Sequence, residues 1–310
     1  MPIPEVPGPG VPARFVYALS GGVDSICLLD WLFAAGRRPV VAHFNHRWAK
    51  QEDVTALFCA NHVAELGLPF VFAEAPQSLP HTEESARNAR YRFLIAVAKR
   101  RRLGVIITAH NADDQAETLL LRLIRGAGVR GLAAMRPETR LNGIKIVRPW
   151  LCVYRTEIEA RARARRLKWR EDPFNKDLRL LRTRVRHRLM PLLREEFAAD
   201  IAMRLVRTAE ILAEEDRWLE ASAREALAKC RDHSDPGRLV TPALAAMPQP
   251  VIRRIMLLWF AEHKVPDVGF AEIESAIGLL GDLKISKVNL PGGRFLRRRE
   301  KRLFLEGAKK

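Results

Sequence analysis

The sequence predicts an α/β protein, in which a parallel sheet covered by helices is followed by a smaller, mainly helical domain. Between residues 15 and 125, apolar β-branched runs alternate with helical patterns, which is typical of repeated β–α units. Polar residues follow three of these runs, at the carboxyl ends where parallel sheets bind ligands. After about residue 200, strand patterns become rare and helical periodicity dominates.

The elements of the first part follow one another in a regular order. Strands are expected at 15–19, 40–44, 70–73 and 105–108, and helices at 25–35, 54–66, 83–102 and 112–125. Asn142-Gly143 lies between two short apolar runs, which predicts a hairpin at the edge of the sheet. Residues 1–12 are rich in Pro and Gly and lack the apolar core of a signal peptide, so we expect a disordered tail.

The change of pattern near residue 200 predicts the domain organisation. We expect an α/β domain at 13–195 and a helical domain at 200–310, with helices at 202–229, 250–263 and 270–280. Two β-like segments, 287–290 and 295–305, flank Pro291-Gly292-Gly293 and predict a last short hairpin.

The chain is strongly basic. Its 310 residues carry a formal net charge of +17, and basic residues gather at 99–102, 161–170, 179–188 and 294–302. An arginine-rich proteome would also raise the charge. The clustering nevertheless favours a surface that binds a polyanion.

Membrane and metal-cluster functions find no support in the sequence. No apolar run approaches the roughly 18 residues that a membrane helix needs, so we expect no membrane contact and a cytoplasmic location. The four cysteines (Cys27, Cys59, Cys152 and Cys230) form no Cys-x-x-Cys pair, which disfavours zinc and iron–sulfur sites. We expect reduced, mainly buried thiols.

A glycine-containing segment joins the first expected strand to the first expected helix. Its residues are Ser20, Gly21, Gly22, Val23, Asp24 and Ser25. Two glycines let the backbone approach a bound group, and the N–H groups of a helix N-terminus bind anions. A plain turn is the alternative. The strand before the segment, the helix after it and the acid within it favour a phosphate site, although it is neither a Walker A loop nor a dinucleotide fingerprint.

Three acids at the start of the fourth expected helix form a second cluster. Asp113 and Glu117 are four residues apart and share a helix face, and Asp114 lies in the first turn beside Asp113. Capping of the helix N-terminus is the alternative, and it explains one acid better than three. Beside a phosphate site, the cluster predicts binding of a cation, either Mg²⁺ or an ammonium group.

Arginines and histidines near the strand ends are further candidates. Arg87 and Arg90 are three residues apart on one expected helix and can meet phosphate or nucleic acid together, whereas a solvated helix face is the alternative. His43 and His46 flank Asn45 at the carboxyl end of the second expected strand. Contacts to a nucleotide are favoured there over metal ligation, because no third ligand is near in sequence.

Together these motifs resemble the tRNA(Ile)-lysidine synthetase family, whose first loop is shared by the N-type ATP pyrophosphatases, or PP-loop enzymes. The resemblance covers roughly residues 14–195 and is carried by segments 20–25, 43–46, 84–91, 108–118, 125–132, 148–151, 171–175 and 182–187. The run 109–118 and the pair formed by 172–175 with 182–186 are its most specific parts.

The chain also departs from the family pattern. Asn45 stands where the family commonly has Asp, so if that Asp helps to hold metal, another oxygen must replace it here. Phe174 and Thr183 replace expected polar residues. The chain resembles the shorter, two-domain members, so contacts to tRNA are expected from the helical domain and the basic patches.

The resemblance implies a reaction and its site residues. With ATP and Mg²⁺, L-lysine is joined to C2 of the wobble cytidine of tRNA(Ile) with a CAU anticodon, through an adenylated cytidine, with release of AMP and pyrophosphate. The catalytic residues implied are Asp24, Asp113, Asp114 and Glu117. The ATP-binding residues implied are Ser20, Gly21, Gly22, Val23, Asp24, Ser25, His43 and Asn45. The tRNA-binding residues implied are Arg87, Arg90, Arg122, Arg125, Arg182, Arg184 and Arg186, and a homodimer stays an open alternative.

Two other functions are weighed against this one. Another tRNA-modifying PP-loop enzyme, such as a 2-thiolase, usually needs a cysteine pairing that this sequence lacks. A non-catalytic RNA-binding protein on a degenerate nucleotide fold is disfavoured by the intact loop at 20–25 and by the three acids.

Overall fold

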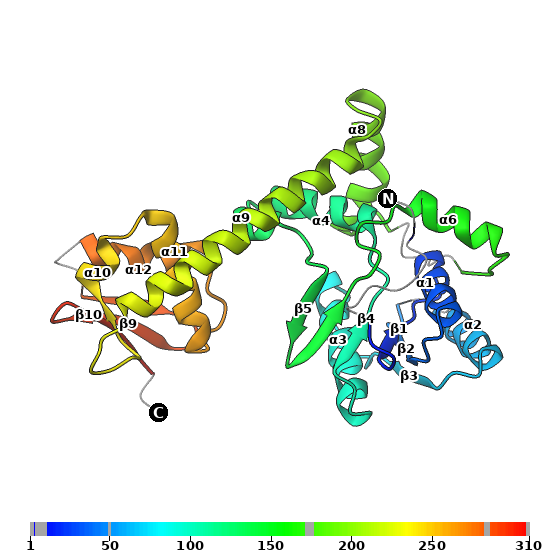
Figure 1. The fold of residues 1–310 in the computed structure, drawn as a ribbon, viewed down its shortest axis with the longest axis horizontal. Helices are drawn as coiled ribbons and strands as arrows, with labels where there is room; N and C mark the ends of the chain where they lie inside the picture. Colours follow the sequence, from blue (N-terminus) through cyan, green and yellow to red (C-terminus); the bar gives the residue numbers. More distant parts are fainter. Residues whose placement is uncertain (1–2, 4–10, 49–50, 171–176, 282–285, 308–310) are drawn as a thin grey trace. The chain divides into compact units, whose positions relative to one another are not determined.

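The computed structural model describes residues 3, 11–48, 51–170, 177–281 and 286–307. The chain divides into two compact units, residues 1–213 and 214–310, and each is described by itself (Figure 1). The helix α9 (Ile201–Cys230) begins in the first unit and ends in the second. Near the N-terminus, Val11 is buried and Ile3 packs against the same apolar core.

The first unit is built on a six-stranded sheet. The order across it is β3 (Phe70–Glu74), β2 (Val40–Asn45), β1 (Val16–Ala18), β4 (Val105–Ile107), β6 (Ile144–Val147) and β5 (Glu138–Leu141). Five strands are parallel, and the edge strand β5 is antiparallel to β6. The predicted parallel sheet is therefore confirmed.

Helices cover both faces of this sheet. They include α1 (Val23–Ala34), α2 (Gln51–Glu65), α3 (Glu83–Arg100) and α6 (Arg155–Ala164). Successive residues of a strand point to opposite faces. Tyr17 lies in one apolar core with residues of α1, α2 and α6, whereas Val16 lies in a separate core with residues of α3. Burial on both faces explains why the strands appear in the sequence as continuous apolar runs.

The predicted hairpin at Asn142-Gly143 is confirmed. These residues have φ of +50° and +83°, as the tight turn between β5 and β6 requires. Of its two strands β5 is the edge strand, because β6 also pairs with β4.

A second helical layer comes from two segments, one between β4 and β5 and one after α6. It consists of α4 (Ala112–Ile124), α5 (Val129–Leu132), α7 (Leu181–Arg184), the π-helical turn η2 (Val185–Leu189) and α8 (Met190–Glu196). Apolar residues of α4 pack against Val185 of η2 and Met190 of α8. The start of α4 is thereby held beside α7 and η2, at the edge where β4 ends.

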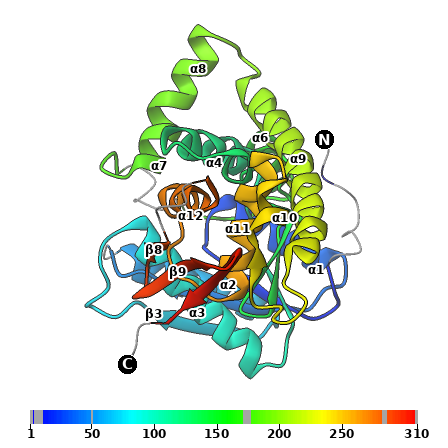
Figure 2. The same ribbon diagram turned by 90° about the vertical axis from the view of Figure 1, so that its left-hand side faces the viewer.

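The second unit is mainly helical with a small antiparallel sheet, as predicted. It contains α10 (Thr241–Ala245), α11 (Gln249–Glu262), α12 (Phe270–Gly281), β7 (Leu239–Val240), β8 (Lys287–Leu290), β9 (Arg294–Arg299) and β10 (Arg302–Glu306). The strand order is β7, β10, β9, β8, and α12 packs against β8 (Figure 2).

The interpretation of residues 295–305 as one strand is wrong. The chain reverses between β9 and β10 at Glu300 and Lys301, whose φ angles are +49° and +63°. Neither residue type is common in such a turn, so the sequence carries no turn signal there. The hairpin between β8 and β9, around Pro291-Gly292-Gly293, is as predicted.

A buried ion pair joins α9 to α11 inside the second unit. Arg254 Nη2 lies 2.5 Å from Asp216 Oδ1, and the two residues are 6% and 0% exposed. Removing one partner of such a pair leaves an uncompensated buried charge, whereas replacing both with apolar residues does not.

We expect Arg254→Met to lower the free energy of unfolding by about 3–5 kcal/mol, because Asp216 then loses its buried partner. The double variant Arg254→Met/Asp216→Leu should recover most of this loss. Urea unfolding followed by circular dichroism measures both. A double variant no more stable than Arg254→Met would contradict this account.

Candidate active site

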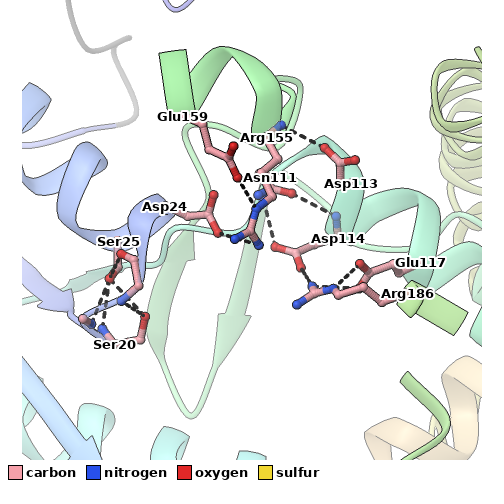
Figure 3. A network of polar contacts seen from close by, with 12 residues as sticks. Ser20, Asp24, Ser25, Asn111, Asp113, Asp114, Glu117, Arg155, Glu159 and Arg186 are labelled. Carbon is pink, nitrogen blue, oxygen red and sulfur yellow. Dashed lines mark hydrogen bonds and ion pairs between the residues drawn. The ribbon is translucent and has the colours of Figure 1, made fainter. Parts of the chain in front are cut away.

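The phosphate loop (residues 20–25) connects β1 to α1 and is fixed by its own hydrogen bonds (Figure 3). The Ser25 hydroxyl accepts from the N–H groups of Ser20 and Gly21 at 3.2 and 3.1 Å, and donates to the Gly22 carbonyl at 3.0 Å. Gly21 has φ +87°, a conformation that favours glycine. The loop therefore has a defined shape before a ligand binds.

The N-terminus of α1 is open to an anion. Gly22 is the N-cap residue, and no side chain caps this helix end within the described part of the chain. The first N–H groups of a helix lack intrahelical partners, and the helix dipole adds positive potential there. The loop and the helix end together form a site of the kind that binds phosphate.

Asp24 extends from the first turn of α1 and is largely buried. Its Oδ1 atom has no hydrogen-bond partner among the described residues, and Oδ2 lies 3.8 Å from Arg155 Nη1. Burial raises the pKa of Asp24 to about 6, Arg155 opposes the rise and Asp114 adds to it. A buried carboxylate oxygen without a partner fits Mg²⁺, which takes one or two carboxylates together with phosphate oxygens.

A cavity of about 740 Å³ lies at the carboxyl edge of the sheet. Its wall contains the phosphate loop, the end of β2, the start of α4 and residues of α7, η2 and α8. Ligand pockets typically occupy about 300–1,000 Å³, so this cavity has room for a nucleotide and a second substrate group.

Four charged side chains form a network on the cavity wall. Figure 3 shows three of them, Asp114, Glu117 and Arg186, away from Ser20 and Ser25. Arg182 donates to Asp114 Oδ1 at 2.9 Å and to Glu117 Oε2 at 3.0 Å. Arg186 donates to Glu117 Oε1 at 2.6 Å and to Asp114 Oδ1 at 3.0 Å. We call this group the arginine–carboxylate network. It fastens α4 to α7 and η2.

The network keeps its groups charged despite burial. Burial by itself would raise the pKa of Asp114, but Arg182, His110 and Arg186 hold it below its usual range. Burial would likewise lower the pKa of Arg186, yet Glu117 and Asp114 raise it. The cavity wall therefore holds paired opposite charges near neutral pH.

The three predicted acids do not share one task. Asp113 pairs with Arg194 Nη2 at 3.0 Å and accepts from the N–H of Arg155 at 2.9 Å. Asp114 accepts from the N–H of Asn111 at 3.1 Å, and its own N–H donates to Asn111 Oδ1 at 3.0 Å. This is a capping box, so Asp114 caps α4 while it also belongs to the network.

Two histidines supply neutral acceptors to the cavity. Burial lowers the pKa of His43, whose Nδ1 lies 2.8 Å from the Leu19 carbonyl and donates to it. Its Nε2 is then an acceptor, and it has no partner among the described residues. Burial also lowers the pKa of His46, to about 4. Both rings are therefore uncharged at neutral pH, and both suit contacts to a base or sugar.

Some predicted site residues lie away from the cavity. Asn45 Nδ2 donates to Asp53 Oδ1 at 2.8 Å and so joins β2 to α2. Arg122 donates to two backbone carbonyls, at 2.7 and 2.6 Å, in the segment that follows α4. Arg125 and Arg184 are exposed and do not line the cavity.

Other predicted residues do line the cavity, together with two that sequence reasoning missed. Arg87 and Arg90 form part of its wall, and neither makes an ion pair with a carboxylate of the described residues. Arg155 and Arg194 were missed, because no spacing in the sequence links them to Asp24 or Asp113. The predicted motif at 171–175 lies outside the described residues.

The sheet and the phosphate loop define a PP-loop domain. A family model described as a PP-loop domain matches residues 6–193. The solved structure of the U34-tRNA thiolase NcsA from Methanococcus maripaludis, with its 4Fe–4S cluster, has the same fold, with a TM-score of 0.54 and 17% sequence identity. That match covers 65% of this chain and 72% of the thiolase.

Two relatives narrow the family. The tRNA(Ile)-lysidine synthase of Thermosynechococcus vestitus is 34% identical, over 92% of this chain and 84% of its own. That of Synechocystis sp. is 33% identical, over 93% and 89%. The chain belongs to the tRNA(Ile)-lysidine synthase family, and it is an ATP-using enzyme of that family. No helix in the described ranges is long and apolar enough to span a membrane.

The two loop glycines predict different effects of alanine. At Gly22 a Cβ would lie no closer than 3.6 Å to a neighbouring atom, so Gly22→Ala should fold normally. It should weaken ATP binding by more than about tenfold, because the methyl group occupies the path of the phosphate. Isothermal titration with ATP measures this. Unchanged ATP affinity in folded Gly22→Ala would remove the phosphate-loop assignment.

Gly21→Ala is the matched comparison. Its Cβ would lie 2.8 Å from Thr55 Cγ2, and its φ is unfavourable for alanine. We expect a lower melting temperature for Gly21→Ala and an unchanged one for Gly22→Ala.

The raised pKa of Asp24 predicts that the stability of the folded chain depends on pH. Its pKa is about 6 in the folded chain, against about 3.9 unfolded, so the folded state binds more protons between these values. Stability should therefore fall as pH rises from about 4 to 6, by about 2–3 kcal/mol. Asp24→Asn should raise the melting temperature at pH 7.5 but not at pH 4. An equal effect at both values would contradict the shift.

Proposed function

We propose that this chain joins L-lysine to C2 of the wobble cytidine of tRNA(Ile), with cleavage of ATP to AMP and pyrophosphate. In the first step the cytosine O2 attacks the α-phosphorus and pyrophosphate leaves. In the second, the ε-amine of lysine attacks C2 and AMP leaves with the oxygen. One observation carries the proposal: a single cavity has an anion-binding loop and a set of buried carboxylates in its wall.

The phosphate loop and Asp24 would hold the triphosphate. The uncapped N–H groups at the start of α1 would face the charge that develops on the departing pyrophosphate, and such fixed donors stabilise transition states most when water is excluded. Mg²⁺, when bound, neutralises phosphate charge. Asp24 would be its protein ligand, because its Oδ1 lacks another partner among the described residues.

Lysine would bind on the side of the arginine–carboxylate network. Its ε-ammonium needs a carboxylate partner, and with a reference pKa near 10.4 it must lose a proton before it attacks. Glu117 is 3% exposed and bonded to two arginines, so an incoming ammonium competes with Arg182 and Arg186 for the same oxygens.

The RNA would reach the cavity along its basic rim. Arg87 and Arg90 line the wall and are suited to phosphate oxygens. The cytidine must leave its stack to enter, which costs least in a single-stranded loop. We assign further tRNA contacts to the helical domain at 200–310, and we place the reaction in the cytoplasm. Sedimentation of the free enzyme would decide between monomer and homodimer.

Incorporation of radiolabelled lysine into a tRNA(Ile) transcript with a CAU anticodon tests the proposal. We expect incorporation that needs ATP and is lost when the wobble cytidine is replaced by uridine. A chain that binds the transcript but incorporates no lysine would leave only an RNA-binding function.

Cysteine chemistry of the thiolase type finds no site here. Cys27, Cys59 and Cys230 are buried, Cys152 is exposed, and the described ranges contain no group of three or more His, Cys, Asp or Glu side chains that could hold a metal ion. The likeness to the thiolase is a likeness of fold.

Glu117→Gln should raise the KM for lysine by about ten- to a hundredfold, because one charge-assisted hydrogen bond contributes about 1.5–3 kcal/mol. Pyrophosphate release without lysine should change little. Glu138→Gln, which affects an exposed pair with Lys145, is the matched control and should leave both unchanged. Loss of pyrophosphate release with an unchanged lysine KM would place metal, not lysine, at Glu117.

A further inference from the structure

A second concavity lies on the helical segment that carries the arginine–carboxylate network. Its volume is about 270 Å³. The apolar part of its lining comes from α4, α7, η2 and α8, and consists of Ile124, Leu181, Val185, Leu189 and Leu192. Arg184 and Arg188 complete it. We call this concavity the outer groove.

The outer groove and the reaction cavity use opposite sides of one helical segment. Arginines occupy alternate positions from 182 to 188, and residues two apart on a helix point in nearly opposite directions. Arg182 and Arg186 line the reaction cavity, where Asp114 and Glu117 balance them. The other two arginines line the outer groove.

The two outer arginines differ from the inner pair in charge balance. Arg184 and Arg188 are exposed, and their side chains make no ion pair or hydrogen bond within the described part of the chain. The apolar lining beside them is also open, since Ile124 is 54% and Leu192 is 47% exposed. Exposed apolar side chains beside unbalanced cations fit a ligand that is apolar on one side and anionic on the other.

We propose that the outer groove binds one unpaired nucleotide of the RNA substrate, with its base on the apolar floor and its phosphate on Arg184 and Arg188. The inference rests on the proposed function, which supplies the RNA. A nucleobase presents an apolar face that packs on side chains, and its phosphate pairs with arginine. An apolar helix would instead bury two arginines without a carboxylate, which is costly.

The outer groove lies where a nucleotide close to the reacting cytidine would bind. The groove and the cavity are separated by one helix, whose diameter is about 10 Å with side chains. A strand that delivers its wobble base to the cavity passes over this helix. The outer groove would then hold a neighbouring base splayed out of the loop, so that the reacting base stays unstacked.

Paired arginine variants test the groove. Arg184→Ala/Arg188→Ala should raise the Kd for the tRNA transcript by about tenfold and reduce the slope of log K against log salt by about 0.7, the value for one single-strand phosphate. Arg100→Ala/Arg101→Ala is the control, because it removes the same charge from two exposed arginines at the end of α3. Thermal unfolding and ATP affinity should be unchanged in both.

A photocrosslink locates the contact directly. A transcript with 4-thiouridine immediately 5′ of the wobble cytidine, or two positions 3′ of it, should crosslink to a peptide within residues 181–192 of the unmodified chain. Equal weakening in the two double variants, or crosslinks only outside this segment, would overturn the proposal. So would a dimer of the unmodified chain that is lost in Arg184→Ala/Arg188→Ala. Failure of lysine incorporation in the unmodified chain tests the proposed function separately, since tRNA binding is still measured.

Discussion

The arginine–carboxylate network is the interaction on which the shape of the cavity depends. It joins residues 65 to 72 positions apart in the chain, and it sets α7 and η2 against the start of α4. A buried set of charges is weak evidence for stability, because apolar residues of the same size are often as stable. The role of the network here is to position α7 and η2 beside the start of α4. The π-helical turn η2 begins one residue before Arg186, and such turns are frequent at functional sites.

Parallel topology explains why so many charges meet at one edge. Each parallel strand ends at the same side of the sheet, and the helix that follows it starts there with its positive end. Both α1 and α4 begin in this way, and Asp24 and Asp114 lie in their first turns. The same positive ends that suit a phosphate also favour these carboxylates. Acids and an anion site are therefore compatible within one cavity.

The sequence predicted what depends on local pattern and missed what depends on distant contacts. The phosphate loop and the strands β1 to β4 follow from apolar runs and glycines, and the fold agrees with them. The orientation of the Arg182 side chain could not be predicted from such local patterns. Its spacing favours RNA, but buried acids on another helix turn it inward. The contact of Asn45 could not be predicted either, because its partner Asp53 lies on α2 and no local sequence pattern links the two residues.

Clusters of arginine that look equivalent in the sequence have different roles in the structure. In the run 294–302, Arg297 pairs with Glu306 at 2.7 Å, Arg298 donates to the Leu279 carbonyl at 2.5 Å, and Arg302 pairs with Asp232. These side chains hold the small sheet together and join it to α12. In the run 179–188, half of the alternating arginines are balanced by carboxylates and half are not. Net charge therefore indicates a polyanionic partner only in general. Our proposal for where such a partner binds rests on the arginines that have no carboxylate partner and lie beside an open apolar surface.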